Sequence, residues 1–221
     1  MASINLKHTS GNGTILNSPA ANPSSDITLK LPSTTGSAGQ VLKVASANHS
    51  STNAELEFAA EGASGKILQV VSTTTTSVSS VSVATGAFGS LGPTVSITPS
   101  SSSNKVLITS AIEVSAETGS INHDYRLLAN GSVITAAIGD AAGSRKQCTG
   151  TNESYHSESS ATLSINFLHS ANTTSAVTYS IQVSHSSSST RVIYSNRSGG
   201  DGNDSKIGRY TSTITAMEVA A

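Results

Sequence analysis

The feature that most constrains this chain is a two-residue alternation of apolar and polar side chains in short runs. In the segment 105–117 the apolar residues fall on one side of an extended chain, and the same holds for 176–185. The apolar sets are Val106, Ile108, Ile112, Val114 and Ala116 in the first segment, and Val177, Tyr179, Ile181 and Val183 in the second. A period of two is typical of a half-buried β-strand. Both segments are therefore predicted to be strands that cross a core.

Similar runs recur along the rest of the chain and predict an all-β fold. Further strands are expected at 66–73, 94–98, 160–168, 191–195 and 208–219. The dipeptide Asn130-Gly131 tolerates the positive φ angles of a two-residue turn, which predicts a hairpin over 122–138. Many short strands without helices indicate a β-sandwich or jelly roll. Two polar stretches, 140–160 and 196–206, are expected to be loops.

Composition supports β structure and predicts a lean core. Ser and Thr far outnumber the charged residues, which make up 11% of the chain, and Thr and Val suit a pleated sheet. Trp is absent, and only three Phe and five Tyr are available to fill an interior. We therefore expect identical neighbouring subunits to supply part of the missing burial, because such interfaces can resemble a divided core.

Residues 1–62 differ from the remainder, because Gly, Asn, Ser and Pro interrupt very short apolar runs. Residues 26–45 predict two short strands around a glycine-bearing loop, with Pro32 ending the first strand. Such a piece is too small to be stable alone, so it is expected to pack against copies of itself or against a partner. The predicted division is a segment 1–62 followed by a domain 63–221.

Several function classes are disfavoured by the sequence. The net charge is −1 and no basic run occurs, which argues against nucleic-acid binding. No apolar segment has the length of a signal peptide or a membrane span, so the chain is expected to be made in a cytoplasm, to stay soluble and not to insert into a membrane. The single cysteine, Cys148, permits no internal disulfide and lacks the partners of a zinc site.

Each chemical cluster in the sequence has a plainer interpretation that we favour. Asp201, Asn203 and Asp204 could contribute to a calcium site, but their spacing does not fit an EF-hand and a solvated loop is preferred. The histidines at 123, 169 and 185 could gather around a metal on a threefold axis, or they could be hydrogen-bonded residues at strand ends, which we favour. Seven Asn-X-Ser/Thr sequons are attributed to an Asn- and Ser-rich composition. They lie at Asn12, Asn48, Asn130, Asn152, Asn172, Asn196 and Asn203.

The sequence contains no combination of residues that indicates a catalytic site. Cys148 and His156 lack an identifiable orienting acid, no G-X-S-X-G motif is present, and the acidic residues are isolated among hydroxyls. We predict that the chain is not an enzyme and binds no cofactor or metal. The most prominent binding candidate is instead a polar loop on a rigid scaffold. Its predicted receptor-contact residues are Arg145, Lys146, Tyr155 and His156.

Five segments carry a resemblance to known proteins. SDITLKLPSTTGSAGQVLKV (25–44) resembles the N-terminal region of virion structural and fibre proteins of tailed phages, particularly marine and cyanobacterial phages. The C-terminal half resembles the trimeric jelly-roll heads of such proteins, similar in outline to tumour-necrosis-factor and C1q-like modules. The matching segments are GKILQVVS (65–72), VSITPSSSSNKVLITSAIEV (95–114), SINFLHSANTTSAVTYSIQV (164–183) and STITAMEVAA (212–221).

The resemblance implies a non-enzymatic homotrimer at the virion surface, in which residues 1–62 form a short extended anchor and stalk attached to other capsid or tail proteins. The jelly-roll head would then point outward for host-surface contact, with a dedicated carbohydrate-binding adhesin that holds a host glycan as the alternative. The candidate anchoring residues are Ile4, Leu6, Ile15 and Leu16. For the trimer interface we consider one face of the C-terminal strand, although either face could be the buried one. The interface candidates are Tyr210, Ile214 and Ala216.

Overall fold

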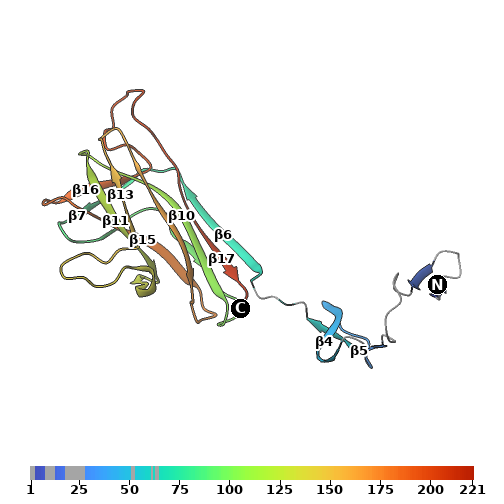
Figure 1. Cartoon of the computed structure of the whole chain (residues 1–221). Coiled ribbons are helices and arrows are strands. Elements are labelled where there is room, and N and C mark those ends of the chain that lie inside the picture. The colour runs from blue at the N-terminus through green and yellow to red at the C-terminus, as the bar shows by residue number, and fades with distance from the viewer. Residues whose placement is uncertain (1–2, 8–12, 18–27, 51–52, 61, 63–64) are drawn as a thin grey trace. The chain divides into compact units, whose positions relative to one another are not determined.

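The computed structural model describes residues 3–7, 13–17, 28–50, 53–60, 62 and 65–221. Its contacts divide the chain into two compact units, Met1–Gly62 and Ala63–Ala221 (Figure 1). The functions expected for these two segments stay predictions. The described part of the chain contains no helix that could span a membrane.

The first unit contains a hairpin and a three-stranded sheet. The hairpin pairs β1 (Ser3–Lys7) with β2 (Gly13–Asn17). In the sheet, β5 (Asn53–Ala60) lies between β3 (Thr28–Lys30), which runs parallel to it, and β4 (Gln40–His49), which runs antiparallel. The strand β5 was not predicted, although Leu56 and Phe58 alternate with Glu55 and Glu57 in its sequence.

The second unit consists of two six-stranded antiparallel sheets. The first sheet has the order β6-β17-β10-β16-β7, and β14 pairs with the other edge of β10. Its strands are β6 (Ile67–Thr75), β7 (Ser79–Val83), β10 (Lys105–Ala116), β14 (Ala161–His169), β16 (Arg191–Ser195) and β17 (Ser212–Val219). The second sheet has the order β12-β11-β15-β8, with β13 on β11 and β9 on β15. Its strands are β8 (Gly89–Ser90), β9 (Val95–Ile97), β11 (Ile121–Ala129), β12 (Ser132–Val133), β13 (Gly150–Ser154) and β15 (Val177–His185).

The two sheets enclose one hydrophobic core, which confirms the prediction of an all-β sandwich. The apolar sets predicted for β10 and β15 are buried, and residues of both sheets belong to the same cluster. Apart from one 3-10 turn at Thr135–Ala137, the described residues contain no helix. The predicted hairpin turn is also present, since Asn130 and Gly131 have φ angles of 49° and 79°.

The second unit buries a hydrophobic cluster within one chain. Branched aliphatic residues from both sheets fill it, and Tyr125 and Tyr179 take the places that Phe or Trp would hold. The Tyr125 hydroxyl donates to the Ser164 carbonyl at 2.7 Å, so its polar end is satisfied inside the protein. Whether neighbouring copies add further burial stays a prediction.

The strands β7 and β13 were not predicted, because their sequences contain few apolar residues. β7 pairs with β16 and contributes only Val81 and Val83 to the interior. β13 lies within the stretch 140–160, which we expected to be entirely loop, and it pairs with β11. Ser154 at the end of β13 is fully buried, and a hydrogen bond with His123 satisfies its hydroxyl. Both segments form strands because their backbones pair with a neighbouring strand, rather than because their side chains are hydrophobic.

Candidate functional site

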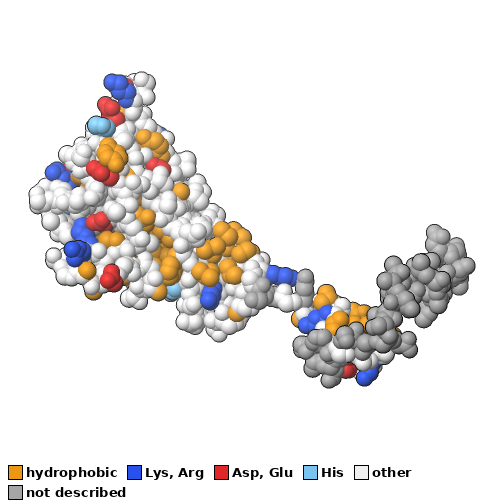
Figure 2. Space-filling view, viewed as in Figure 1, with side chains coloured by type: hydrophobic (Ala, Val, Ile, Leu, Met, Phe, Trp, Pro, Cys, Tyr) orange, Lys and Arg blue, Asp and Glu red, His pale blue; other side chains and the backbone are white. Residues whose placement is uncertain are grey.

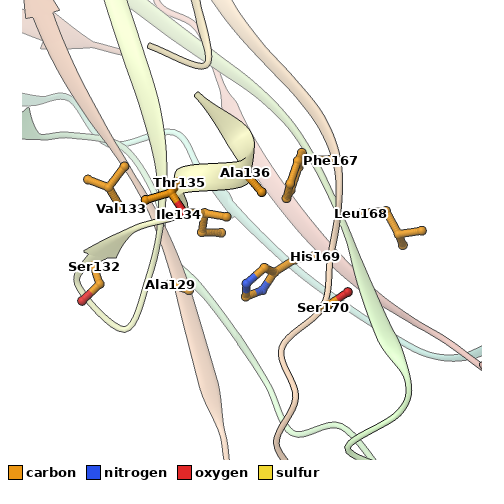
Figure 3. A pocket seen from close by; sticks show the side chains of 10 residues that line it. All are labelled: Ala129, Ser132, Val133, Ile134, Thr135, Ala136, Phe167, Leu168, His169 and Ser170. Atoms are coloured by element: carbon orange, nitrogen blue, oxygen red, sulfur yellow. The ribbon is translucent and has the colours of Figure 1, made fainter. Parts of the chain in front are cut away.

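One cavity of about 400 Å³ lies beside the β11–β12 hairpin (Figure 3). The 3-10 turn forms one wall, and the end of β14 forms the other. The lining residues are Ala129, Ser132, Val133, Ile134, Thr135, Ala136, Phe167, Leu168, His169 and Ser170. The ring of His169 points into the space between these walls, whereas Leu168 points away. Strand alternation explains this difference, because neighbouring residues project to opposite faces.

His169 is held by the core tyrosine Tyr179. Its Nδ1 lies 2.8 Å from the Tyr179 hydroxyl, and the two rings meet edge to face with centroids 5.6 Å apart. Burial lowers the pKa of His169 and raises the pKa of Tyr179 to about 12. Both groups are therefore neutral at neutral pH. None of the residues that line this cavity is acidic or basic apart from His169, so the cavity suits binding of an uncharged group better than acid–base chemistry.

A second cavity, which we call the Arg145 pocket, holds two of the predicted receptor-contact residues. Its volume is about 420 Å³, and its lining residues are Thr85, Gly86, Asp124, Arg145, Lys146, His185, Ser186 and Ser187. The Lys146 ammonium donates to the Asp124 carboxylate at 3.0 Å, to the Ser184 hydroxyl at 2.9 Å and to the His185 carbonyl at 2.6 Å. All three ammonium protons are thus used within the chain.

Arg145 is the more available cation of this pocket. It is exposed, and its guanidinium makes one long contact of 3.4 Å to the Ala142 carbonyl. A planar guanidinium can bind a carboxylate or sulfate in a bidentate manner. The pocket therefore presents the Arg145 guanidinium to solvent beside Ser and Thr hydroxyls. Lys146 instead links the residues that form the wall of the pocket.

Tyr155 and His156 are not brought into this pocket. They follow β13, whereas Arg145 and Lys146 precede it, so the two pairs are separated by a five-residue strand that spans roughly 15 Å. The Tyr155 side chain is 64% exposed, and its carbonyl accepts the Ser120 backbone N–H. The four predicted receptor-contact residues therefore form two separate surface groups. Whether either group contacts a receptor stays a prediction.

The candidate trimer-interface residues Ile214 and Ala216 point into the core of their own chain and are fully buried. Tyr210 precedes β17, and its hydroxyl lies 3.0 Å from the Ser198 hydroxyl. The outward face of β17 is instead formed by Thr213, Thr215 and Met217. A subunit contact through this strand must therefore use the outward face, and the trimer itself stays a prediction.

The outward face of the first sheet is built mainly from small uncharged residues. Hydroxyl pairs cross it, with Ser72 bonded to Thr215 at 2.9 Å and Thr74 bonded to Thr213 at 2.8 Å. A shallow hollow of about 270 Å³ lies at its centre beside Ala111. The face is completed by Val70, Leu107, Thr109, Ser164, Asn166, Leu168 and Met217. Figure 2 shows an apolar patch on the second unit at the β6 side, where Ile67, Leu68 and Val70 are exposed.

The candidate anchoring residues lie on the β1–β2 hairpin. The backbone register pairs Ile4 with Leu16, and Asn5 with Ile15, while Leu6 is paired with Thr14. Their side chains lie outside what the structure describes, so their anchoring role stays a prediction.

The three strand-end histidines do not converge on one point of the surface. His123 and His185 are buried opposite each other in the β11–β15 pair, and His169 lines the cavity of Figure 3. The possible calcium ligand Asp201 is instead paired with Arg197 at 2.5 Å and with Arg209. No group of three or more His, Cys, Asp or Glu residues that could hold a metal occurs among the residues described. Burial raises the pKa of the Cys148 thiol, which disfavours the reactive thiolate.

Two buried polar residues organise the sandwich and were missed by sequence reasoning. Glu218 is buried at the end of β17 and accepts hydrogen bonds from Gln69, Ser100 and Asn104. Asn196 is also buried, and its amide donates to the Thr75 carbonyl at 3.0 Å. One signal was available for Glu218, because it is the only acidic residue in the otherwise uncharged run 210–221.

Comparisons with known proteins give only distant similarities. No protein-family model and no curated protein matches the chain. The chain is similar to solved structures of infectious bursal disease virus: the T13 viral particle, the Gx strain and the VP2 subviral particle. In that order, the sequence identities are 10%, 11% and 12%, and the TM-scores are 0.38, 0.38 and 0.35. Each match covers 75% of this chain but only 38%, 40% and 40% of the viral chain. The chain thus spans less than half the length of these viral proteins, and similarity at this level does not determine its function.

Proposed function

We propose that the chain is a non-enzymatic structural protein of a phage virion. In this proposal it forms a homotrimeric fibre or appendage, whose N-terminal unit attaches to other capsid or tail proteins and whose sandwich is displayed at the virion surface for host contact. The phage assignment rests on the sequence resemblance described above. Its physical basis is multivalency, because several weak contacts act together when identical copies are linked.

The observation that carries the assembly part of this proposal is the outward face of the first sheet. Between Lys105 and Glu113 the outward residues of β10 are uncharged, and the adjoining strands β6, β17 and β14 present Ser, Thr, Asn and aliphatic side chains. The cores of subunit interfaces are depleted in charge, which this face matches. Exposed Val70 and Leu168 supply apolar surface that a neighbouring copy would cover.

A charge at the centre of this face tests the proposal. Ala111 is exposed beside the central hollow, so Ala111→Lys places an ammonium group inside the proposed contact. Asn122→Lys is the control, because Asn122 is exposed on the outward side of the second sheet. Sedimentation velocity should give three times the 22.3 kDa chain mass for the unmodified protein and for Asn122→Lys, and a smaller mass for Ala111→Lys. A trimer that survives Ala111→Lys would refute this interface.

A second candidate function, a dedicated carbohydrate-binding adhesin, is favoured by the Arg145 pocket. Its open guanidinium and neighbouring hydroxyls suit a sugar that carries a carboxylate or sulfate. Glycan-array binding that is abolished by Arg145→Ala would support this function. An unchanged array profile, or no binding to any glycan by the trimeric protein, would count against it.

A further inference from the structure

The β3–β5–β4 sheet separates its side chains into two chemically different faces. The register places Leu42 opposite Phe58, Val44 opposite Leu56, and Leu29 opposite Ala54. Directly opposed residues project to the same side of a sheet, so these six form an apolar face. The register adds Gln40 and Ala60 at one end of this face and sets the backbone of His49 opposite Ala54 at the other. The opposite side carries Thr28, Lys30, Val41, Lys43, Glu55, Glu57 and Ala59.

An ion pair crosses the charged face, whereas the apolar face is left open. Lys43 and Glu57 lie opposite each other with 3.7 Å between Nζ and Oε1, so this pair already provides polar contacts. On the other side, Leu29, Leu42, Val44 and Phe58 are between 36% and 61% exposed. Phe58 receives partial cover from the turn at Gly36, where an added Cβ would approach its ring to 2.6 Å. The described part of this unit therefore leaves a continuous apolar surface without a covering layer.

The chemistry of this face restricts what can cover it. Among the side chains described on this side none is charged, and the Gln40 amide oxygen already accepts the Ser37 backbone N–H, so an ionic partner would lose hydration without gaining an ion pair. A second apolar sheet is suitable, because two sheets pack face to face through such side chains. The same face of a second copy of this chain is also apolar and has the same dimensions.

The available area is consistent with a contact between copies. Half-exposed Leu, Val and Phe side chains leave roughly 400–500 Å² of apolar surface on each copy, so two copies bury about 800–1,000 Å², which is in the range of weak interfaces rather than stable ones. An interface of this size is weak by itself. It becomes effective when the sandwich domains already hold the copies together, because the second contact then forms at high effective concentration.

We propose that the apolar face of the β3–β5–β4 sheet packs against the same face of neighbouring copies of this chain. This makes the N-terminal unit a second assembly contact, with the Lys43–Glu57 side facing outward. The inference rests on the proposed function only in that copies of the chain assemble. It adds the surface and the partner through which the N-terminal unit takes part.

Cysteine accessibility in the full-length chain tests the proposal with a matched pair of positions. In a Cys148→Ser background, Val44→Cys places a thiol on the apolar face, and Val41→Cys places one on the opposite face of the same strand. The native side chains are similarly exposed in the single chain, at 48% and 41%, so a difference in reactivity requires a covering layer. We expect maleimide labelling of Val44→Cys to be at least about tenfold slower than that of Val41→Cys.

Oxidative cross-linking identifies the covering layer. Oxidation with copper phenanthroline should link Val44→Cys chains into covalent dimers and leave Val41→Cys chains monomeric on a non-reducing gel. Equal labelling rates at the two positions would overturn the proposal, as expected if the face awaits a different virion protein. Slow labelling of Val44→Cys without covalent dimers would overturn it too, because the cover would then come from the same chain.

These results are separable from the test of the sandwich interface. If the sandwich contact is correct but this inference is wrong, the protein is trimeric, Ala111→Lys reduces its mass, and Val44→Cys labels as fast as Val41→Cys. If the sandwich contact is wrong but this inference is correct, Ala111→Lys leaves the mass unchanged while Val44→Cys is protected and cross-links.

Discussion

His123 and His185 face each other across the β11–β15 pair, and both imidazoles are buried. His185 Nε2 lies 2.8 Å from the Val83 carbonyl oxygen, and its Nδ1 accepts the Ser187 backbone N–H. Burial, together with the charge that His185 could carry, lowers the pKa of His123 to about 4, although Asp124 acts in the opposite direction. This pair is therefore expected to make the sandwich sensitive to acid.

Stability should fall as the pH decreases from 6.5 towards 4. The unfolded chain takes up a proton on His123 near pH 6.5, whereas the folded chain does so only near pH 4, so the folded state is favoured fully above 6.5. The loss reaches roughly 3 kcal/mol from this residue. Urea unfolding at a series of pH values measures it. His123→Gln should flatten the curve in this window, and an unchanged slope would contradict the assignment.

A second acid transition should arise from Glu218. Burial alone would raise its pKa, but hydrogen bonds from Asn104, Gln69 and Ser100 together lower it to about 2. The stability that it contributes is present above pH 4.5 and is lost as the pH falls towards 2. Glu218→Ala should destabilise the protein at pH 7 by about 3 kcal/mol or more, because several buried donors lose their acceptor. Glu117→Ala is an exposed control that should remain within about 0.5 kcal/mol of the unmodified protein.

Gly199→Ala should be strongly destabilising. An added Cβ at Gly199 would lie 1.7 Å from the Ala116 carbonyl oxygen, so the end of β10 or the chain after β16 must shift. We expect a loss of about 3 kcal/mol or more in the free energy of unfolding. Gly139→Ala is the matched control, because no atom lies within 4 Å of the added Cβ there. Equal melting temperatures for the two variants would show that the close approach is not maintained in solution.

Ile214→Asp should unfold the sandwich rather than dissociate an assembly. Ile214 is fully buried in the core, and an unpaired carboxylate there costs several kcal/mol. Thr215→Asp, on the outward side of the same strand, should retain the β-sheet signal in circular dichroism. A folded Ile214→Asp protein with reduced mass would mean that this residue lies between subunits after all.

The fold was largely predictable wherever apolar residues alternate over a long strand. The patterns of β10 and β15 identified the inward residues correctly, because each strand has one side in the core. The same reasoning failed for β7 and β13, in which backbone pairing with a neighbouring strand substitutes for side-chain hydrophobicity. The two faces of β17 could not be distinguished either. Its outward Thr213 and Thr215 suit a sheet surface, and its inward Ile214 suits a core or an interface equally well.

The surface sites were less predictable, since they depend on contacts between distant segments. Arg145 and Lys146 were identified as candidate binding residues from a polar loop. Lys146 is held within the chain and Arg145 is not, because the Asp124 carboxylate and the Ser184 hydroxyl accept hydrogen bonds from Lys146. These two acceptors lie on two other strands. Tyr155 is near them in sequence, but β13 separates it in space.

The neighbouring positions of β6 and β17 also affect how the sandwich resists mechanical force. The first and last strands of the second unit pair along their lengths, and the Gly65 N–H donates to the Ala220 carbonyl at their common end. A pull on residue 65, with the opposite end of the sandwich held by a surface, would load the β6–β17 hydrogen bonds in shear. Hydrogen bonds loaded in shear break together rather than one after another. A tether attached at the start of this unit would therefore pull along the direction in which the β6–β17 pair resists force best.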